Sequence, residues 1–237
     1  MPNEMVEYLD NEGINLFSII DLAGLTADLK AKLAAGCPQL DSYSQLLLFG
    51  HGGTRFWQRL SELEIESSNP VDERSVHVIA AWLGKFAKGS DHKILYPGIS
   101  TVPLQDLGRL SGWHHDSPLG LGIHPTYGLW FAYRGVVLLD TAFSPTIALT
   151  DPSPCRSCEA SPCITACPTE ALSHDRFDVN KCVAYRLEDE SNCASKCIAR
   201  LACPLDEHRY TEQQMTYHYS HSLATIKRFR RSKSAAP

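Results

Sequence analysis

The sequence has no long hydrophobic run and no strong excess of charge of either sign. It carries 22 Lys and Arg against 27 Asp and Glu, a formal net charge of −5, which gives no electrostatic reason to expect a nucleic-acid partner. No apolar stretch approaches the roughly 18 to 20 residues that a membrane-spanning helix needs. The opening segment MPNEMVEYLDNEG is acidic and lacks the apolar core of a signal peptide. These absences predict a cytoplasmic protein that makes no membrane contact.

Basic side chains gather in one place, close to the C-terminal end. Five of them precede a short Ser/Ala/Pro ending: Lys227, Arg228, Arg230, Arg231 and Lys233. Such clusters can bind nucleic acid when a folded surface presents them, but at a chain end they are more often simply solvated. We therefore expect a solvated and partly disordered tail there rather than a binding patch.

Cysteine is scarce over the first 150 residues and abundant after them. Cys37 is the single cysteine before residue 155, whereas the other eight of the nine lie between 155 and 203. In a cytoplasmic chain, grouped cysteines indicate metal or redox chemistry more often than disulfides. We interpret Cys37, which stands alone after a helical pattern, as a packed thiol.

The eight grouped cysteines form two runs, each of which ends in a Cys-Pro pair. The runs read Cys155-x2-Cys158-x4-Cys163-x3-Cys167-Pro168 and Cys182-x10-Cys193-x3-Cys197-x5-Cys203-Pro204. In two-cluster ferredoxins, three closely spaced cysteines hold one [4Fe–4S] cluster and the Cys-Pro cysteine ligates the other cluster. On that pattern one cluster is held by Cys155, Cys158, Cys163 and Cys203. The second is held by Cys182, Cys193, Cys197 and Cys167.

A structural zinc site is the alternative for this segment. Zinc ribbons are usually built from two C-x2-C units, and this segment has a single one, at Cys155 and Cys158. The first run also resembles the C-x2-C-x4-C-x3-C-P run in iron–sulfur subunits of respiratory oxidoreductases. The second run departs from ferredoxin spacing, with ten and five residues where two and three are usual. The pattern therefore predicts iron–sulfur, with one cluster on a regular run and a second on an irregular one.

Outside the cysteines, the hydrophobic pattern predicts a mixed α/β chain. Apolar residues recur at helical spacing over 14–35, and Gly36 is placed to end that helix. The stretch 43–63 reads as a strand, a Gly-rich turn and a helix, and 129–140 as a strand buried in a sheet. Further elements are expected as helices over 72–86 and 103–112 and as a strand over 93–98. The sequence DPSPCRS then breaks regular structure, which places a domain boundary near 151.

Two segments carry a resemblance to a known family. GIHPTYGLWFAYRGVVLLD, residues 122–140, resembles the HPxxGGWFAxRGVVLL segment of CblC-type cobalamin-processing proteins. HRYTEQQMTYHY, residues 208–219, is similar to the ERYSEEQKAYF stretch near the C-terminal end of that family, and LSGWHHDSPLGLG, residues 110–122, matches more loosely. The resemblance implies a nitroreductase-like α/β fold that binds cobalamin base-off and reductively removes its upper ligand.

The resemblance also implies which residues contact cobalamin. They are His124, Pro125, Gly128, Trp130, Arg134, Arg209, Tyr210 and Tyr217, with Glu212 and Gln214 matching in the same segment. Leu129 stands where the family has a second glycine, so the closest backbone approach to the corrin is not carried over. From the residues alone, His124 before Pro125 reads as an ordinary loop, because proline holds its predecessor extended.

The family match resumes only after Cys203, so the cysteine segment is expected as an insertion. The overall plan is similar to that of epoxyqueuosine reductase, which couples a related cobalamin-binding fold to two [4Fe–4S] clusters. We therefore expect an α+β protein with a nitroreductase-like α/β domain over 1–150 and an inserted ferredoxin-like module with two [4Fe–4S] clusters over 151–205. Residues 206–237 are expected to form a C-terminal helix that returns to the first domain, followed by the basic tail.

The C-terminal match contains a helix start signal. Thr211 and Gln214 have the spacing of a capping box, so a helix is expected to begin at about 212. Met215, Tyr219 and Leu223 recur every four positions along it, and we expect them to face the main domain.

Together these features predict an oxidoreductase that reduces bound cobalamin and removes its upper ligand. Iron–sulfur centres reach reduction potentials near the low end of a range of about −700 to +450 mV, which suits them to reduce a corrin cobalt. An electron donor such as a ferredoxin or a flavodoxin reductase system would supply the clusters. Two alternatives stay open: a ferredoxin-like electron-transfer protein that binds no cobalamin, and an epoxyqueuosine-reductase-like enzyme that acts on a modified nucleoside or another organic substrate.

Overall fold

The structure is a computed structural model that describes residues 3–63, 67–98 and 101–234, with side chains described as far as residue 230. The chain divides into two compact units. The first comprises Met1–His114 and Phe131–Asp151, and the second comprises His115–Trp130 and Pro152–Pro237. The segment 115–130, expected within a continuous domain over 1–150, belongs to the same unit as the grouped cysteines.

A four-stranded antiparallel sheet forms the centre of the first unit. Its strands are β1 (Leu16–Asp21), β2 (Gln45–Gly52), β3 (His92–Tyr96) and β4 (Phe131–Leu139), in the spatial order β1-β2-β4-β3. All residues of β2 are buried, because this strand is central and covered on both faces. The strands expected in 43–63, 93–98 and 129–140 are confirmed, and so is the mixed α+β class.

Helices flank the sheet in the described part of the first unit. They are α1 (Asn3–Asn11), α2 (Ala27–Gly36), α3 (Arg55–Ser61), α4 (Pro70–Phe86) and α5 (Leu104–Leu110), with the 3-10 turns η1 (Leu22–Gly24) and η2 (Leu40–Ser42). The helices expected over 72–86, over 103–112 and after the Gly-rich turn are confirmed.

The single helix expected over 14–35 is wrong in its first half. This half forms strand β1, and helix α2 begins only after the N-cap Thr26, whose hydroxyl accepts a hydrogen bond from the N–H of Leu29 at 3.3 Å. The first four residues of β1 are all buried, so no alternation of apolar and polar residues marks the strand. Periodicity cannot distinguish a short, fully buried strand from a buried helix. Gly36 ends α2, as predicted.

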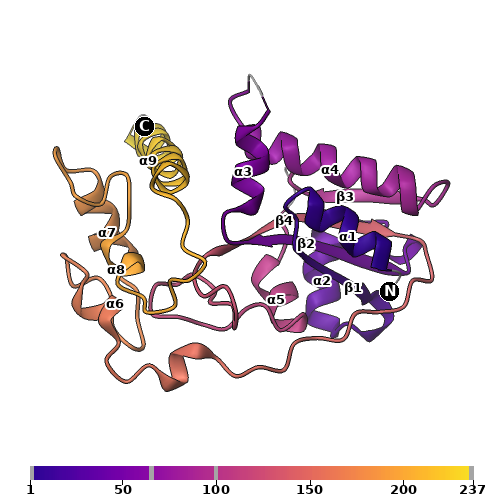
Figure 1. The fold of residues 1–237 in the computed structure, drawn as a ribbon, viewed down its shortest axis with the longest axis horizontal. Helices are drawn as coiled ribbons and strands as arrows, with labels where there is room; N and C mark the ends of the chain where they lie inside the picture. Colours follow the sequence, from indigo (N-terminus) through magenta and orange to yellow (C-terminus); the bar gives the residue numbers. More distant parts are fainter. Residues whose placement is uncertain (1–2, 64–66, 99–100, 235–237) are drawn as a thin grey trace. The chain divides into compact units, whose positions relative to one another are not determined.

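Aromatic side chains fill the interior on one face of the sheet. Trp82 of α4 is fully buried, and its ring centroid lies 5.2 Å from that of Phe17 on β1 and 5.9 Å from that of Phe49 on β2. Side chains alternate along a strand, so the next residue, Ser18, points to the opposite face. There its hydroxyl accepts a hydrogen bond from Ser111, just after α5, at 3.0 Å. Helix α4 and the end of α5 therefore cover opposite faces of the sheet (Figure 1).

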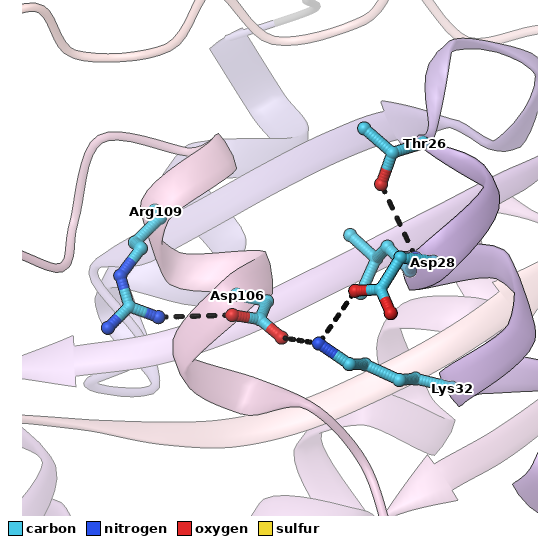
Figure 2. Close-up of polar contacts among 6 residues, drawn as sticks. Thr26, Asp28, Lys32, Asp106 and Arg109 are labelled. Carbon is cyan, nitrogen blue, oxygen red and sulfur yellow. Dashed lines mark hydrogen bonds and ion pairs between the residues drawn. The ribbon is translucent and has the colours of Figure 1, made fainter.

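Ion pairs join α2 to α5 at the surface of the first unit. Figure 2 shows Lys32 of α2 between Asp28 of the same helix, at 2.8 Å, and Asp106 of α5, at 3.1 Å. Arg109 extends the chain of charges by pairing with Asp106 at 3.0 Å. Solvent reaches all four side chains, so it screens the attraction and each pair contributes little to stability.

The second unit consists of short helices joined by loops, followed by one long helix. The elements are η3 (Pro154–Ser157), α6 (Pro162–Thr165), α7 (Val179–Arg186), α8 (Ile198–Leu201) and α9 (Glu212–Ser234). Segment 115–130 folds back on itself through two bridge pairs, His115 with Ile123 and His124 with Gly128. Within the described ranges, no helix is both long and apolar enough to cross a bilayer.

Helix α9 begins where the capping box predicts. The Thr211 hydroxyl accepts a hydrogen bond from the N–H of Gln214 at 3.1 Å, and Glu212 is the first helical residue. The helix continues to Ser234, so the basic residues from Lys227 onward lie on a helix and the expected disorder of that stretch is wrong. Residues 235–237 of the expected tail lie outside the described residues, as do the side chains of Arg231 and Lys233.

The packing partners of α9 lie in its own unit. Met215 forms a buried cluster with Trp130 and Tyr210, and Tyr219 packs against that cluster. Because Trp130 belongs to the segment 115–130, the helix does return to an earlier part of the chain. That part is the one that shares a unit with the cysteines.

Candidate functional site

Four cysteines line a small cavity of about 40 Å³ in the second unit. They are Cys155, Cys158, Cys163 and Cys203. The rest of the lining includes the leucines Leu119, Leu129 and Leu205, the isoleucine Ile123 and four prolines. Among the described residues, no charged side chain lines this cavity.

Proline-initiated turns place three of these thiols. Cys155 is the second residue of η3, which begins at Pro154, and Cys163 is the second residue of α6, which begins at Pro162. Proline suits the first turn of a helix, because the N–H that it lacks would have no partner there. Cys158 directly follows η3, so these short turns set the spacing of the run.

A second cavity, of about 320 Å³, is lined by the other four cysteines. They are Cys167, Cys182, Cys193 and Cys197. Cys182 lies in α7, and Cys197 is the N-cap of α8, where its sulfur accepts a hydrogen bond from the N–H of Arg200 at 3.4 Å. The end of α7 and the loop after it fill the ten residues between Cys182 and Cys193. The irregular spacing of the second run therefore reflects an inserted helical turn and loop.

Each cavity takes three thiols from one run and the Cys-Pro thiol from the other. Cys203 completes the first cavity, and Cys167 completes the second. The two quartets are the same ones that the ferredoxin pattern predicts from the spacing, whereas their role as cluster ligands stays a prediction. Among the described residues, no three Cys, His, Asp or Glu side chains converge closely enough to bind a single metal ion. Thiols spread around a cavity suit a multi-iron cluster better than one zinc ion with Zn–S distances of about 2.3 Å.

Burial dominates the acidity of the thiols around the first cavity. It raises the pKa of Cys155 to about 11, and it also raises the pKa of Cys163 and of Cys203. The neighbouring thiols of the same quartet raise these pKa values further, because thiolates repel one another. A bound cation or cluster is therefore needed to keep this quartet in the thiolate form that binds metal.

Burial also raises the pKa of Cys182 and Cys197 at the second cavity, but hydrogen bonds reverse its effect at Cys167. Burial would raise the pKa of Cys167, but hydrogen bonds from the N–H groups of Thr169, Ala171 and Leu172 outweigh it and lower the pKa below its usual value. The hydroxyl of Thr169 lies 3.6 Å from the Cys167 sulfur and acts in the same direction. This thiolate is therefore stabilised by the chain before any ligand binds.

Two arginines are buried beside the second cavity. Arg186 and Arg200 both line it and are 9% and 8% exposed. Arg186 donates hydrogen bonds to the carbonyl oxygens of Cys193 and Tyr219 at 3.2 and 2.9 Å, and to the hydroxyl of Ser222 at 3.2 Å. Arg200 donates to the carbonyl oxygen of Leu129, and its buried Nε has no hydrogen-bond partner within the described part of the chain.

The chemistry of these side chains fits an iron–sulfur cluster at the second cavity. A buried cation needs a counter-charge, and the oxygens that receive the hydrogen bonds of Arg186 are all uncharged. A cluster held by four thiolates is anionic and would supply that charge to both arginines. The first cavity also has four cysteines, set in an apolar wall. The residues present therefore fit a cluster at both cavities.

His124, the first of the residues assigned to cobalamin, lies in a tight turn of the second unit. It is 1% exposed, and its Nδ1 accepts hydrogen bonds from the N–H groups of Thr126 and Tyr127 at 3.0 and 3.2 Å. Gly128 closes the turn with φ of +57°, and a Cβ there would lie 2.9 Å from the Cβ of Leu205. The chain's own packing therefore requires this glycine, whether or not a corrin approaches it.

Leu129, which replaces the glycine of the cobalamin-processing family, has a place beside the thiols. It is 2% exposed, packs in one cluster with Leu119 and Cys203, and lines the first cavity. A glycine at this position would leave the cavity without that part of its apolar wall. The departure from the family pattern thus has a structural reason in this chain.

Trp130, Tyr210 and Arg209 meet in one aromatic cluster. Trp130 is fully buried, donates from Nε1 to the carbonyl oxygen of Leu205 at 2.9 Å, and lies edge-on to Tyr210 with ring centroids 5.6 Å apart. The guanidinium groups of Arg200 and Arg209 lie 4.5 and 5.8 Å from the Trp130 ring centroid. These cation–π contacts connect the residues assigned to cobalamin with the arginine beside the second cavity.

The other residues assigned to cobalamin are divided between the two units. Pro125 and Tyr217 are half-buried in the second unit, as part of the turn and of α9. Arg134 lies on β4 in the first unit, is 7% exposed, and donates from Nε to Nδ1 of His51 at 2.9 Å. Among the two further matches on α9, Gln214 is buried and Glu212 is exposed.

Sequence reasoning missed three residues beside the second cavity. Arg186 and Arg200 were unremarkable as single arginines, and Tyr219 was expected only as a packing residue. The Tyr219 hydroxyl lies within hydrogen-bonding reach of both the Cys197 thiol and Arg200, and burial raises its pKa to about 12, so it stays protonated. The available signal was the position of Arg200 between two cysteines, but spacing does not reveal burial.

No protein-family model and no curated protein sequence matches this chain. Solved structures share its fold at low sequence identity. Epoxyqueuosine reductase from Streptococcus thermophilus matches with a TM-score of 0.54 and 14% identity, over 86% of this chain and 66% of its own. The enzyme of that name from Bacillus subtilis matches with a TM-score of 0.56 and 15% identity, over 90% of this chain and 68% of its own.

A reductive dehalogenase, whose structure suggests a mechanism for B12-dependent dehalogenation, also matches. Its TM-score is 0.54 at 13% identity, over 95% of this chain and 35% of its own. This chain therefore spans about two thirds of the length of the epoxyqueuosine reductases and about a third of that of the dehalogenase. The expected similarity to the plan of epoxyqueuosine reductase is supported at the level of the fold: the chain shares its architecture with two classes of reductase.

Proposed function

We propose that this chain is a cobalamin-dependent oxidoreductase that carries two [4Fe–4S] clusters and reduces an organic substrate. The observation that carries the proposal is the crossed grouping of the thiols, in which each run lends its Cys-Pro cysteine to the other cavity. This crossing is the arrangement of two-cluster ferredoxins. In the proposal the sheet unit is nitroreductase-like, the cysteine segment is a ferredoxin-like insertion, and a ferredoxin or flavodoxin system donates the electrons.

The structural relatives favour cobalamin as a cofactor over cobalamin as the molecule processed. By their names, one class reduces epoxyqueuosine and the other carries out B12-dependent dehalogenation, so the molecule that each changes is organic. This support is a likeness of fold at 12–15% identity, and the substrate of the present chain is part of the proposal.

The chain's own side chains would bind and insulate these groups. Bound clusters would supply single electrons at low potential, and bound cobalamin would supply the metal centre at which the substrate is reduced. Leu119, Ile123 and Leu129 would exclude water from the first cavity, and Arg186 and Arg200 would hold positive charge beside the second. His124 would be positioned toward the corrin by the backbone N–H groups that bind its Nδ1.

Purification without air tests the iron–sulfur part of the proposal. The protein should be brown, and it should contain about eight irons per chain if both cavities hold a [4Fe–4S] cluster. Replacing one ligand of the first cavity, Cys158→Ala, should remove about half of the iron. Replacing the buried cysteine of the first unit, Cys37→Ala, should remove none. A colourless protein with stoichiometric zinc would overturn the proposal.

Titration of the brown protein with cob(II)alamin tests the cobalamin part. The visible spectrum of the corrin should change on binding, and His124→Ala should weaken binding while the iron content stays unchanged. The exposed histidine of α4, in the variant His77→Ala, serves as the matched control and should bind cobalamin normally. Cys158→Ala should keep the affinity and lose reduction of the bound cobalt by a low-potential donor. A protein that carries clusters but never responds to cobalamin would instead be an electron carrier.

Removal of the upper ligand of cobalamin is the second candidate activity. The resemblance of residues 122–140 and 208–219 to cobalamin-processing proteins favours it. The two candidates differ in stoichiometry: a processing protein turns over cyanocobalamin with release of cyanide, whereas a cobalamin-dependent reductase keeps one cobalamin through many turnovers of another substrate. Incubation of the anaerobic protein with excess cyanocobalamin and a reductant, with cyanide measured per chain, distinguishes them.

A further inference from the structure

Each of the two cavities is lined by four cysteines, but the electrostatic surroundings of the two quartets differ. Reduction of a [4Fe–4S] cluster adds one electron and breaks no bond, so the reduced form carries one more negative charge than the oxidised form. Nearby positive charge and hydrogen bonds to the sulfur atoms stabilise the reduced form and raise the reduction potential. A difference in such groups between the cavities therefore predicts a difference in potential.

Positive charge is concentrated at the second cavity. Arg186 and Arg200 line it, are nine-tenths buried, and direct their hydrogen bonds to carbonyl and hydroxyl oxygens. No carboxylate neutralises either guanidinium among the described residues, as their hydrogen bonds show. Charges act strongly in a buried, low-dielectric site. Lys196 also lines the cavity, but it is exposed and its charge is screened by water.

Hydrogen bonds to sulfur are also more numerous at the second cavity. At the first, the backbone N–H groups of Cys163 and Ile164 act on the Cys163 sulfur, and that of Leu205 acts on Cys203. Cys197 receives the N–H of Arg200 at 3.4 Å, and the Tyr219 hydroxyl lies within reach of the same sulfur. Tyr219 in turn interacts with the Arg200 guanidinium, which polarises its hydroxyl toward the sulfur. Cys167 receives N–H groups of the backbone after it and the hydroxyl of Thr169.

The first cavity has no comparable charge. Its described lining is made of thiols, prolines, aliphatic side chains and Ser117. The charged side chains that act on Cys203 are Asp206 and Arg209, and these two pair with each other at 3.1 Å. Their opposite charges largely cancel at the first cavity, so an added electron there meets an apolar, uncharged wall.

We propose that the two cluster sites differ in reduction potential, and that Arg186, Arg200 and Tyr219 make the site of Cys167, Cys182, Cys193 and Cys197 the one that is reduced first. The inference rests on the proposed presence of a cluster in each cavity. An electron from the external donor then resides mainly on the cluster at the second site. The cluster at the first site has the lower reduction potential, so once reduced it is the stronger reductant of the two. The three residues act through the ligands that they contact, so they are positioning and tuning residues.

A redox titration of the anaerobic holoprotein, followed by electron paramagnetic resonance, tests this inference. We expect two separate reduction waves, and Cys158→Ala should abolish the wave at lower potential. Arg186→Gln should move the other wave to lower potential, by about a tenfold change in the reduction equilibrium, which is about 59 mV for a one-electron couple. Arg186→Lys keeps the charge and should restore most of the shift. Arg176→Gln, an exposed arginine that pairs with Asp178 at 3.2 Å, should move neither wave.

Tyr219→Phe keeps the test decisive if Arg186→Gln fails to hold its cluster. This change removes one hydroxyl at constant ring volume, so it should lower the upper wave by less than Arg186→Gln and leave the lower wave in place. Coincident waves, loss of the upper wave in Cys158→Ala, or unchanged potentials in both variants would overturn the inference while leaving the clusters intact. Absence of iron would overturn the proposed function itself, and absence of cobalamin binding would leave this inference standing.

Discussion

The first unit closes its interior with aromatic and aliphatic side chains, whereas the second unit lines two of its cavities with thiols. In the first, Trp82, Phe17 and Phe49 meet between α4 and the sheet, and β2 is buried along its whole length. In the second, the helices between 152 and 205 have only four to eight residues. Helices this short are not stable alone in water. The comparison teaches that the first unit carries its own hydrophobic core, and that the second would gain much of its stability from the clusters proposed for its thiols.

Removal of iron should have the largest effect, and it should separate the two units. If the proposed clusters are bound, anaerobic chelation leaves eight buried or half-buried cysteines without the iron that links them, so the segment 152–205 should lose most of its hydrogen-exchange protection. The strands of the first unit should keep theirs, because no described cysteine cluster lies among them. Hydrogen exchange with mass spectrometry measures both in one experiment. Equal loss of protection in β2 and in α7 would contradict the comparison.

Among single substitutions in the first unit, Trp82→Ala should have the largest effect on the free energy of unfolding. The side chain is fully buried and contacts four aromatic rings, so its removal should lower the free energy of unfolding of that unit by roughly 3–5 kcal/mol. Urea unfolding followed by circular dichroism measures the loss. Iron per folded chain should stay at the wild-type value, and a parallel loss of iron would show that the second unit depends on this core.

Gly128→Ala should have an intermediate effect, confined to the second unit. The new Cβ would meet Leu205 at 2.9 Å in addition to the strain of a positive φ, so we expect about 2–5 kcal/mol of destabilisation as the sum of the two terms. Gly89→Ala is the matched control in the first unit, because its φ is +83° but a Cβ there has open space. It should show the strain alone, about 1–2 kcal/mol. Similar decreases in the free energy of unfolding of the two variants would contradict the packing role assigned to Gly128.

Lys32→Ala should have the smallest effect. The side chain bridges Asp28 and Asp106 at the surface of the first unit (Figure 2), where water and salt screen both pairs. These carboxylates raise the pKa of Lys32, so the ammonium stays charged and its contribution is present below its ordinary pKa and is lost as pH rises through the raised value. The urea midpoint at neutral pH should therefore stay within error of wild type. A large loss would mean that surface charge, as well as the core, stabilises the first unit.

Sequence patterns predicted the secondary structure well where local signals were present. The turn glycines before α3, Gly36 at the end of α2 and the capping residues Thr211 and Gln214 each mark a boundary that the structure confirms. The apolar pattern over β1 predicts a helix instead of the observed strand, because burial on both faces removes the alternation that identifies a strand. The tail from Lys227 was expected to be partly disordered, and it is helical because α9 simply continues.

The candidate site also has a part that local sequence patterns predict and a part that depends on long-range contacts. The crossing of Cys167 and Cys203 could be predicted because two-cluster ferredoxins share the pattern of three closely spaced cysteines followed by a Cys-Pro pair. The role of these thiols as ligands stays a prediction, as does that of His124 toward cobalamin. Nothing in the spacing indicated that Arg134 and Trp130, four residues apart, belong to different units.

By itself the sequence determined the grouping of the cysteines and most of the strands and helices, because ligand spacing, capping and turn chemistry act over a few residues. Only the tertiary structure decided which side chains surround the thiols. Arg186 and Arg200 became buried beside one quartet and Leu129 beside the other through contacts between segments distant in sequence. Burial of a charge depends on the whole packed environment rather than on neighbours along the chain, so no local sequence pattern predicts the burial of these arginines.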